Sequence, residues 1–261
     1  MRPILAIAGT TIGEAIRRKV LLIILLIGVI FLIVAPGLGV LSTRSEDTVL
    51  RSMMLGIIQL TSAVIAIVLT VYMIPNEIER RTIYTILSKP VHRWQFLVGK
   101  FLGAVGALGL MMALMSLVMI VAYIIQRRDP AAALALLQAP ALFFIQMSLL
   151  AAVAIFFSTF VAPLVNFFLS GGMFVLGITF NPLVETLQQN PNTNAITKGF
   201  VTILGTLLPN FANYQIANPL INPNQTIVNP ATYYLNVTAY GIMYIGVLLI
   251  AGILIFERRE V

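Results

Sequence analysis

Six long apolar runs divide the chain, and shorter polar stretches separate them. The runs are almost free of charged residues, and their apolar positions do not alternate with polar ones. About 18 apolar residues suffice for a membrane-crossing helix, whereas strands of a membrane barrel alternate in polarity. The pattern therefore predicts an all-α polytopic membrane protein, one transmembrane domain over residues 1–261. Its six transmembrane helices are expected at residues 20–41, 53–74, 96–125, 140–161, 163–183 and 237–256.

Three segments outside these runs have patterns of their own. Residues 1–19 repeat apolar positions with a helical period, which predicts an amphipathic interfacial helix before the first span. Residues 184–236 contain four Asn-Pro pairs, which are typical of turns, and form a long extracytoplasmic segment. Within it, residues 195–208 are apolar enough for a helix that dips into the outer leaflet. The third segment, residues 76–90, is discussed below.

The charge distribution predicts which side of the membrane each loop faces. Only 10% of the residues are charged, against roughly 25% in soluble domains, so lipid must cover much of this chain. With both termini in the cytoplasm, eleven of the sixteen Lys and Arg residues fall on the inner side, as the positive-inside rule requires. We therefore expect a multi-pass protein of the cell inner (plasma) membrane. The basic residues bracket the apolar runs, which excludes a nucleic-acid partner.

The sequence offers no site for chemistry of its own. All nine acidic residues lie in flanks or loops, so the buried carboxylate usual in ion-coupled carriers is missing. There is one histidine, His92, and no cysteine, which excludes a catalytic zinc site. No Gly-x-x-x-x-Gly-Lys-Ser/Thr motif occurs. We expect no catalytic, cofactor-binding or metal-binding residues, and a membrane-embedded lipid enzyme lacks the polar cluster it would need.

The most structured polar segment is residues 75–100, on the inner side between the second and third spans. Asn76 is placed to cap a short helix, with Glu77 and Glu79 in its first turn. Apolar residues give this helix one hydrophobic side, and Pro90 ends it. Such a helix suits insertion into a groove on another protein. An ordinary interfacial loop whose charges only set topology explains the same residues, and both interpretations stay open on this pattern alone.

The stretch EIERRTIYTILSKPVHRWQFLVGKFLG resembles the cytoplasmic loop of ABC-2-type permeases, the membrane subunits of ATP-binding-cassette transporters. TTIGEAIRRK, near the start, resembles that family's N-terminal interfacial helix, and LPNF at residues 208–211 resembles a segment before its last span. Arg81 departs from the glycine that many members carry there. The matching loop positions are Glu79, Thr82, Ile83, Leu87, Ser88, Pro90, Arg93, Phe96, Gly99 and Lys100.

The resemblance implies a permease of an exporter-type assembly, paired in a homodimer or heterodimer and driven by separate cassette ATPase subunits. ATP and Mg²⁺ would bind those partners, and this chain would need no cofactor. The family's coupling helix corresponds to residues 76–90 and enters a cleft of the ATPase. By this comparison, the ATPase-contact residues are Glu77, Glu79, Arg80, Arg81, Thr82, Ile83, Leu87, Ser88, Pro90 and Arg93, of which the last two would fix the loop to the third span.

Two further questions stay open at the level of sequence. The alternative function is a non-transporting membrane scaffold or mechanotransmission subunit, which would use the same ATPase contact.

Polar residues inside the spans either line a pathway or bond a neighbouring helix, and we favour the second for Gln59, Thr61, Asn166 and Ser170. A track of glycines on the third span predicts close helix packing, within or between subunits. The track comprises Gly99, Gly103, Gly106 and Gly109, and methionines for packing are expected at Met111, Met112, Met115 and Met119.

Overall fold

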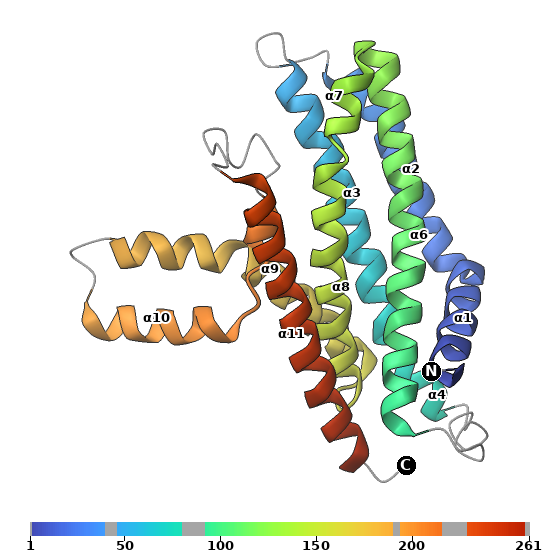
Figure 1. Cartoon of the computed structure of the whole chain (residues 1–261), viewed down its shortest axis with the longest axis vertical. Coiled ribbons are helices and arrows are strands. Elements are labelled where there is room, and N and C mark those ends of the chain that lie inside the picture. The colour runs from blue at the N-terminus through green and yellow to red at the C-terminus, as the bar shows by residue number, and fades with distance from the viewer. Residues whose placement is uncertain (1, 40–45, 80–91, 190–193, 216–228, 259–261) are drawn as a thin grey trace.

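A computed structural model describes residues 2–39, 46–79, 92–189, 194–215 and 229–258, and every regular element in these ranges is a helix (Figure 1). The N-terminal half contains α1 (Arg2–Arg17), α2 (Lys19–Gly39), α3 (Glu46–Val71), α4 (Met73–Glu79) and α6 (Arg93–Arg127). The second half contains α7 (Pro130–Ala135), α8 (Gln138–Ser158), α9 (Pro163–Gln189), α10 (Ala195–Leu207), the 3-10 turn η1 (Ala212–Tyr214) and α11 (Pro230–Arg258).

Six helical stretches within the described ranges are long and apolar enough to cross a membrane, which confirms the predicted fold class. They coincide with α2, α3 with α4, α6, α7 with α8, α9, and α11. α6 has 35 residues and so extends about 52 Å, well beyond a hydrocarbon core of ~30 Å. A helix of this length must tilt or project from the membrane.

α8 is the centre of the bundle and packs against α3, α6, α9 and α11. The most apolar windows of the α3 and α8 spans are 67% and 72% buried, whereas those of α2 and α11 are 22% and 17% buried. α3 and α8 therefore form the core, and the outer helices expose large apolar side chains such as Ile23 and Met243. The methionines of α6 belong to this core, since all four are buried, as predicted.

α1 and α6 run side by side in the same direction, in contact through the glycine track. A Cβ on Gly99 would lie 2.9 Å from Cβ of Ile7, and one on Gly103 would lie 2.5 Å from Cβ of Thr11. A Cβ on Gly106 would lie 2.9 Å from Cδ1 of Ile12, and one on Gly109 would lie 3.1 Å from the Phe144 ring of α8. The contacts at Gly99 and Gly103 leave no room for a larger residue, and all four glycines pack within the subunit. The predicted amphipathic helix at the N-terminus thus uses one of its sides to pack on α6.

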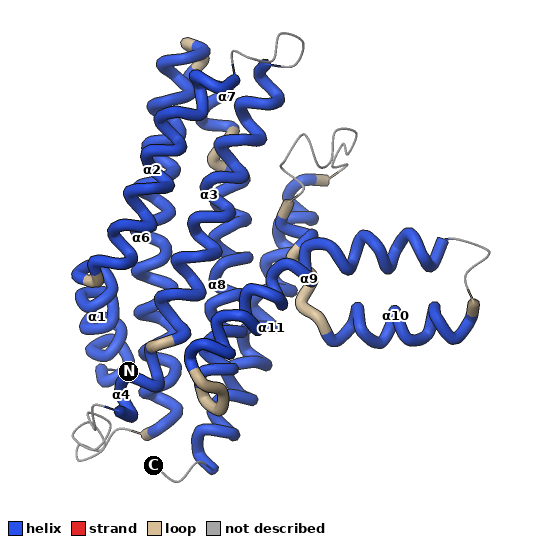
Figure 2. The backbone as a smooth tube through the Cα atoms, turned by 180° about the vertical axis from the view of Figure 1, so that it is seen from behind, coloured by secondary structure: helices blue, strands red, loops and turns tan. Residues whose placement is uncertain are grey.

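The end of α9 and α10 form a hairpin that projects sideways from the bundle (Figure 2). We call this pair the outer hairpin. Lys198 Nζ donates to the Gln188 carbonyl oxygen at 3.0 Å, and Gln188 Nε2 lies 3.0 Å from Thr202 Oγ1. The opposite side of α10 exposes Ile196, Phe200 and Ile203. Their spacing of four and three residues forms one apolar stripe along the helix.

Residues 208–215 follow the outer hairpin and return into the bundle, and we call them the re-entrant segment. Phe211 is fully buried, and its ring lies 5.5 Å from that of Phe174 in α9. A Cβ on Gly177 would lie 2.4 Å from Cδ2 of Phe211, so only glycine permits this approach. The LPNF sequence therefore occupies the interior of the bundle, although it lies within the range 184–236 that the sequence assigns to the outside.

Of the four polar residues predicted to bond neighbouring helices, Asn166 and Gln59 do so, whereas Ser170 bonds within its own helix and Thr61 is placed by packing. Asn166 Nδ2 donates to the Ala154 carbonyl oxygen at 2.9 Å and so links α9 to α8. Ser170 Oγ lies 2.8 Å from Asn166 Oδ1. Gln59 bonds Gln146 of α8, in a group of contacts described below. Thr61 packs against Gly28 of α2, where a Cβ would lie 2.8 Å from its hydroxyl oxygen.

Candidate functional site

The candidate site is the end of the bundle where α4, the start of α1, the start of α6 and the end of α11 lie (Figure 1). α4 follows α3 after a break at Tyr72, and the next described helix is α6. The predicted cap at Asn76 is wrong, because its backbone N–H already bonds the Tyr72 carbonyl oxygen inside α4. Pro75 is tolerated because it sits in the first turn, where a backbone N–H needs no helical partner.

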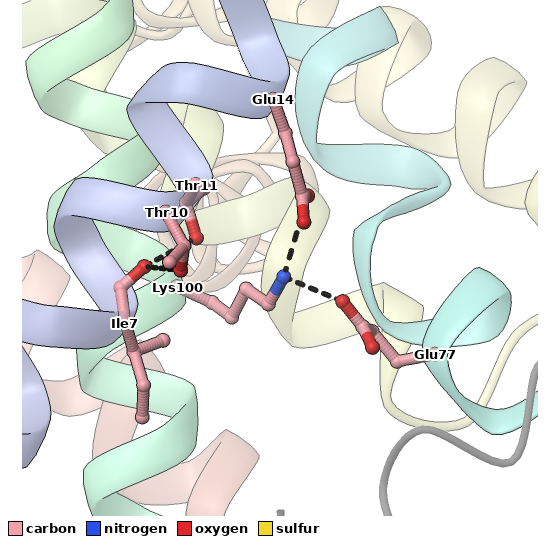
Figure 3. Close-up of polar contacts among 6 residues, drawn as sticks. All are labelled: Ile7, Thr10, Thr11, Glu14, Glu77 and Lys100. Atoms are coloured by element: carbon pink, nitrogen blue, oxygen red, sulfur yellow. Dashed lines mark hydrogen bonds and ion pairs between the residues drawn. The ribbon is translucent and has the colours of Figure 1, made fainter.

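A buried lysine joins three elements at this end (Figure 3). Lys100 Nζ of α6 lies 2.7 Å from Glu77 Oε1 of α4 and 3.7 Å from Glu14 Oε2 of α1. The Lys100 side chain is 5% exposed, the Glu77 side chain 15% and the Glu14 side chain 52%. A buried ammonium needs a charged partner, so the short contact with Glu77 is the one that compensates its desolvation.

The α1 side of this cluster is fixed by its own backbone bonds. Thr10 Oγ1 and Thr11 Oγ1 both donate to the Ile7 carbonyl oxygen, at 2.9 and 2.8 Å (Figure 3). Thr11 is buried against Gly103, one helical turn along α6 from Lys100. The hydroxyls therefore need no outside partner, and the backbone of α1 approaches α6 closely. The partner of Glu77, Lys100, therefore belongs to a closely packed pair of helices, and a displacement of α4 at Glu77 acts on that pair.

The start of α6 is tied to the end of α11. Arg93 Nη1 donates to the carbonyl oxygens of Phe256 and Glu257, at 3.1 and 3.3 Å. The last carbonyls of a helix lack helical partners and carry partial negative charge, so a guanidinium is favoured there. The Arg93 guanidinium also lies 5.9 Å from the centre of the Phe256 ring, which stacks with Phe96 at 6.3 Å.

His92 begins α6 with a capping box. Its backbone N–H donates to Oε1 of Gln95 at 3.2 Å, and its carbonyl oxygen accepts from the Gln95 backbone N–H at 3.0 Å. His92 thus has a local structural role. It fixes the point at which the chain enters α6.

The predicted ATPase-contact residues fall into two groups. Glu77 and Arg93 lie at the two ends of the loop, and the structure turns both toward other helices of this chain. Glu79 ends α4, and nothing further is described of its side chain. The other predicted contact residues, which lie outside the described ranges, are Arg80, Arg81, Thr82, Ile83, Leu87, Ser88 and Pro90.

Sequence reasoning missed part of this site. Glu14 is one of nine acidic residues in flanks and loops and does not stand out among them, and the carbonyls of Phe256 and Glu257 carry no signal in the sequence. Lys100 did carry a signal, because it is the one charged residue inside an otherwise apolar run. A charge in that position requires a partner, and the two nearest inner segments both contain glutamates.

Comparison with known proteins gives one finding over nearly the whole chain. The profile of a family described as ABC-2 family transporter protein matches residues 5–261. The match includes every residue of the site described above. No curated protein matches the chain.

Proposed function

The chain belongs to the ABC-2 transporter family and is a multi-pass permease subunit, and on this premise we propose that a separate cassette ATPase drives it to move substrate outward across the inner membrane. The ATPase would supply the free energy of ATP hydrolysis, with ATP and Mg²⁺ bound to that partner. This chain would supply the membrane path and the contact that receives the movement. Both termini would then lie in the cytoplasm, beside the ATPase.

The observation that carries the proposal is the ion-paired base of the loop between α4 and α6. Glu77 precedes the loop and is 2.7 Å from Lys100, which follows it. Arg93 binds the end of α11. The two ends of the loop are thereby connected to α1, α6 and α11, so a force on residues 80–91 would reach three helices at once.

In this proposal the residues of the contact divide their tasks. Residues from Glu79 to Ser88 would touch the ATPase. Glu77 and Arg93, at the base, would pass its movement to the helices that they bind. Lys100 is suited to this task because it is buried and has no other acidic partner among the described residues than Glu77 and Glu14. Separating Lys100 from Glu77 would leave a buried charge without compensation. The ion pair therefore resists separation, and a movement of Glu77 is passed to Lys100.

Recruitment of the ATPase tests the proposal. The tagged permease is purified from its native membrane in mild detergent, and co-purifying proteins are identified and counted by mass spectrometry. We expect a P-loop ATPase in stoichiometric amount, and its loss in Glu79→Lys and Ile83→Asp. Arg128→Glu, a charge reversal in an exposed residue at the opposite end of α6, is the matched control and retains the ATPase.

The result separates the two candidate roles. Equal recruitment by all variants would overturn the assignment of the loop as the contact, and the absence of any ATPase from intact protein would overturn the driven permease. An ATPase found without transport, together with an adjacent gene for a peptidase or assembly factor, would favour the mechanotransmission role. A second permease chain in the same sample would identify a heterodimer.

A further inference from the structure

A chain of three amide hydrogen bonds lies in the middle of the bundle, and the backbone between Phe211 and Gln215 connects its two ends. Gln215 Nε2 donates to Gln59 Oε1 at 3.3 Å, and Gln59 Nε2 donates to Gln146 Oε1 at 3.0 Å. Gln146 Nε2 then donates to the Phe211 carbonyl oxygen at 2.9 Å. This chain of bonds begins and ends in the re-entrant segment and passes through α3 and α8. We call these three glutamines and the Phe211 carbonyl the glutamine ring.

The glutamine ring is buried. Gln146 is fully buried, and Gln59 and Gln215 are 8% and 7% exposed. Gln59 and Gln146 lie near the middle of their spans, Asp47–Glu77 and Pro130–Ser158. Non-helical backbone at this depth persists only where protein groups satisfy it, because lipid offers no hydrogen bonds. The ring provides such a partner for Phe211, and each amide in the chain of bonds polarises the next.

Other helices also hold the re-entrant segment, from its remaining sides. The Phe211 N–H donates to the Gly177 carbonyl oxygen of α9 at 3.0 Å. From α11, the Tyr240 hydroxyl accepts from the Asn210 N–H at 3.0 Å, and the Tyr233 hydroxyl donates to the Asn213 carbonyl oxygen at 2.6 Å. Within the described ranges, Gln59 makes the hydrogen-bond connection from α3 to this segment.

α3 is also the helix that continues into α4 and the loop. Gln59 precedes Met73, the first residue of α4, by 14 positions, which is about 21 Å along a helix. Glu77 at the inner end of this rod binds Lys100, and Gln59 at mid-depth binds the re-entrant segment. The segment in turn leads directly from α10. The consecutive helices α3 and α4 therefore touch both the inner loop and the polypeptide that anchors the outer hairpin.

We propose that Gln59, Gln146 and Gln215 are positioning residues that make the place of the outer hairpin depend on α3. Movement of α3 by the ATPase breaks or shifts the glutamine ring, which releases or pulls the re-entrant segment and with it α10. This inference rests on the proposed function for its driving force. Its static part, which is that the glutamine ring holds the outer hairpin in place, does not depend on the proposed function.

The chain suits a distance measurement because it has no cysteine, so two introduced cysteines take spin labels at known places. Ile203→Cys on α10 and Leu235→Cys on α11 are both exposed, at 61% and 68%. Their distance distribution is measured by pulsed electron resonance in the reconstituted complex, without nucleotide and with trapped ATP. The labelled protein is compared with the same protein carrying Gln59→Leu, Gln215→Leu or the control Gln126→Leu. Gln126 is an exposed glutamine of α6 outside the ring.

We expect a distance change on ATP trapping in the ring-intact protein and in Gln126→Leu. Gln59→Leu loses the change and broadens the distribution, while the complex hydrolyses ATP within twofold of the unmodified rate. Gln215→Leu gives the same loss from a position outside the spans, so it serves if Gln59→Leu is not recovered from the membrane. A simple folding defect would lower ATP hydrolysis and distance change together.

Two results would overturn the inference. One is an unchanged ATP response in Gln59→Leu and Gln215→Leu, and the other is a hairpin that does not respond to ATP when the ring is intact. If no ATPase co-purifies, the proposed function fails on its own. The permease alone then decides the static part, since equal distribution widths with and without the ring would show that it does not hold the hairpin.

Discussion

The Lys100 cluster yields a graded prediction, because its two acidic partners differ in distance and burial. Lys100→Met removes the ammonium and leaves Glu77 facing a buried apolar side chain. Breaking a buried pair in this way costs about 3–5 kcal/mol, and the partial exposure of Glu77 places the cost near the lower value. Glu77→Gln keeps an acceptor beside Lys100, and we expect about 2 kcal/mol. Glu14→Gln removes a half-exposed carboxylate that lies 3.7 Å from Lys100, and it should cost under ~1 kcal/mol.

The double variant Lys100→Met with Glu77→Met is the decisive member of the series. It removes both charges, and its loss of stability should be smaller than that of Lys100→Met alone. Thermal unfolding in detergent, followed by size-exclusion chromatography of the heated protein, measures the series. A loss of about 3 kcal/mol corresponds to a midpoint lowered by ~6–12 °C for a chain of this size. Equal losses of stability in Glu14→Gln and Glu77→Gln, or additive losses of stability in the double variant, would refute Glu77 as the main partner of Lys100.

Three further predictions follow from contacts described above. Gly103→Ala should lower the melting midpoint through its collision with Thr11, whereas Gly172→Ala, whose Cβ meets nothing within 4 Å, should not; equal midpoints would refute the packing of α1 on α6. Asn166→Leu should cost about 1 kcal/mol, the usual size of an interhelical polar contact in membranes, and a larger effect of a surface change such as Leu164→Ala would contradict this. Burial raises the pKa of the Tyr214 phenol, so the folded state holds its proton more tightly than the unfolded state, and stability should fall above about pH 10. Melting midpoints across pH 8–11 should fall less steeply in Tyr214→Phe, and parallel curves would exclude the effect.

The spans could be predicted because their signal is local. Length and apolarity decide whether a segment crosses a bilayer, and both are visible without knowing its neighbours. The end of the second span was harder to predict, because proline often ends a helix, whereas Pro75 is tolerated in the first turn of α4. Which helix covers the glycine track was equally beyond the sequence. A row of glycines indicates close helix packing, but only the fold shows that α1 is the helix that packs there.

The buried course of the re-entrant segment could not be predicted for a related reason. Its composition is that of a loop, and loops normally stay on the surface, where water satisfies their backbone groups. Here the partner of Gln215 is Gln59, 156 residues earlier in the chain. At the candidate site, Lys100 was recognisable as a charge that needs a partner. Its choice of Glu77 depends on the break at Tyr72, which turns α4 toward α6.

The 156-residue separation within the glutamine ring also has a consequence for biosynthesis. When α3 enters the membrane, neither Gln146 nor Gln215 has been synthesised, and an amide in hydrocarbon without partners is costly. α8 supplies the first bond, 87 residues later, and Gln215 supplies the last only as the final span is about to emerge. A nascent chain that has not reached residue 215 therefore holds α3 and α8 in a partly satisfied state.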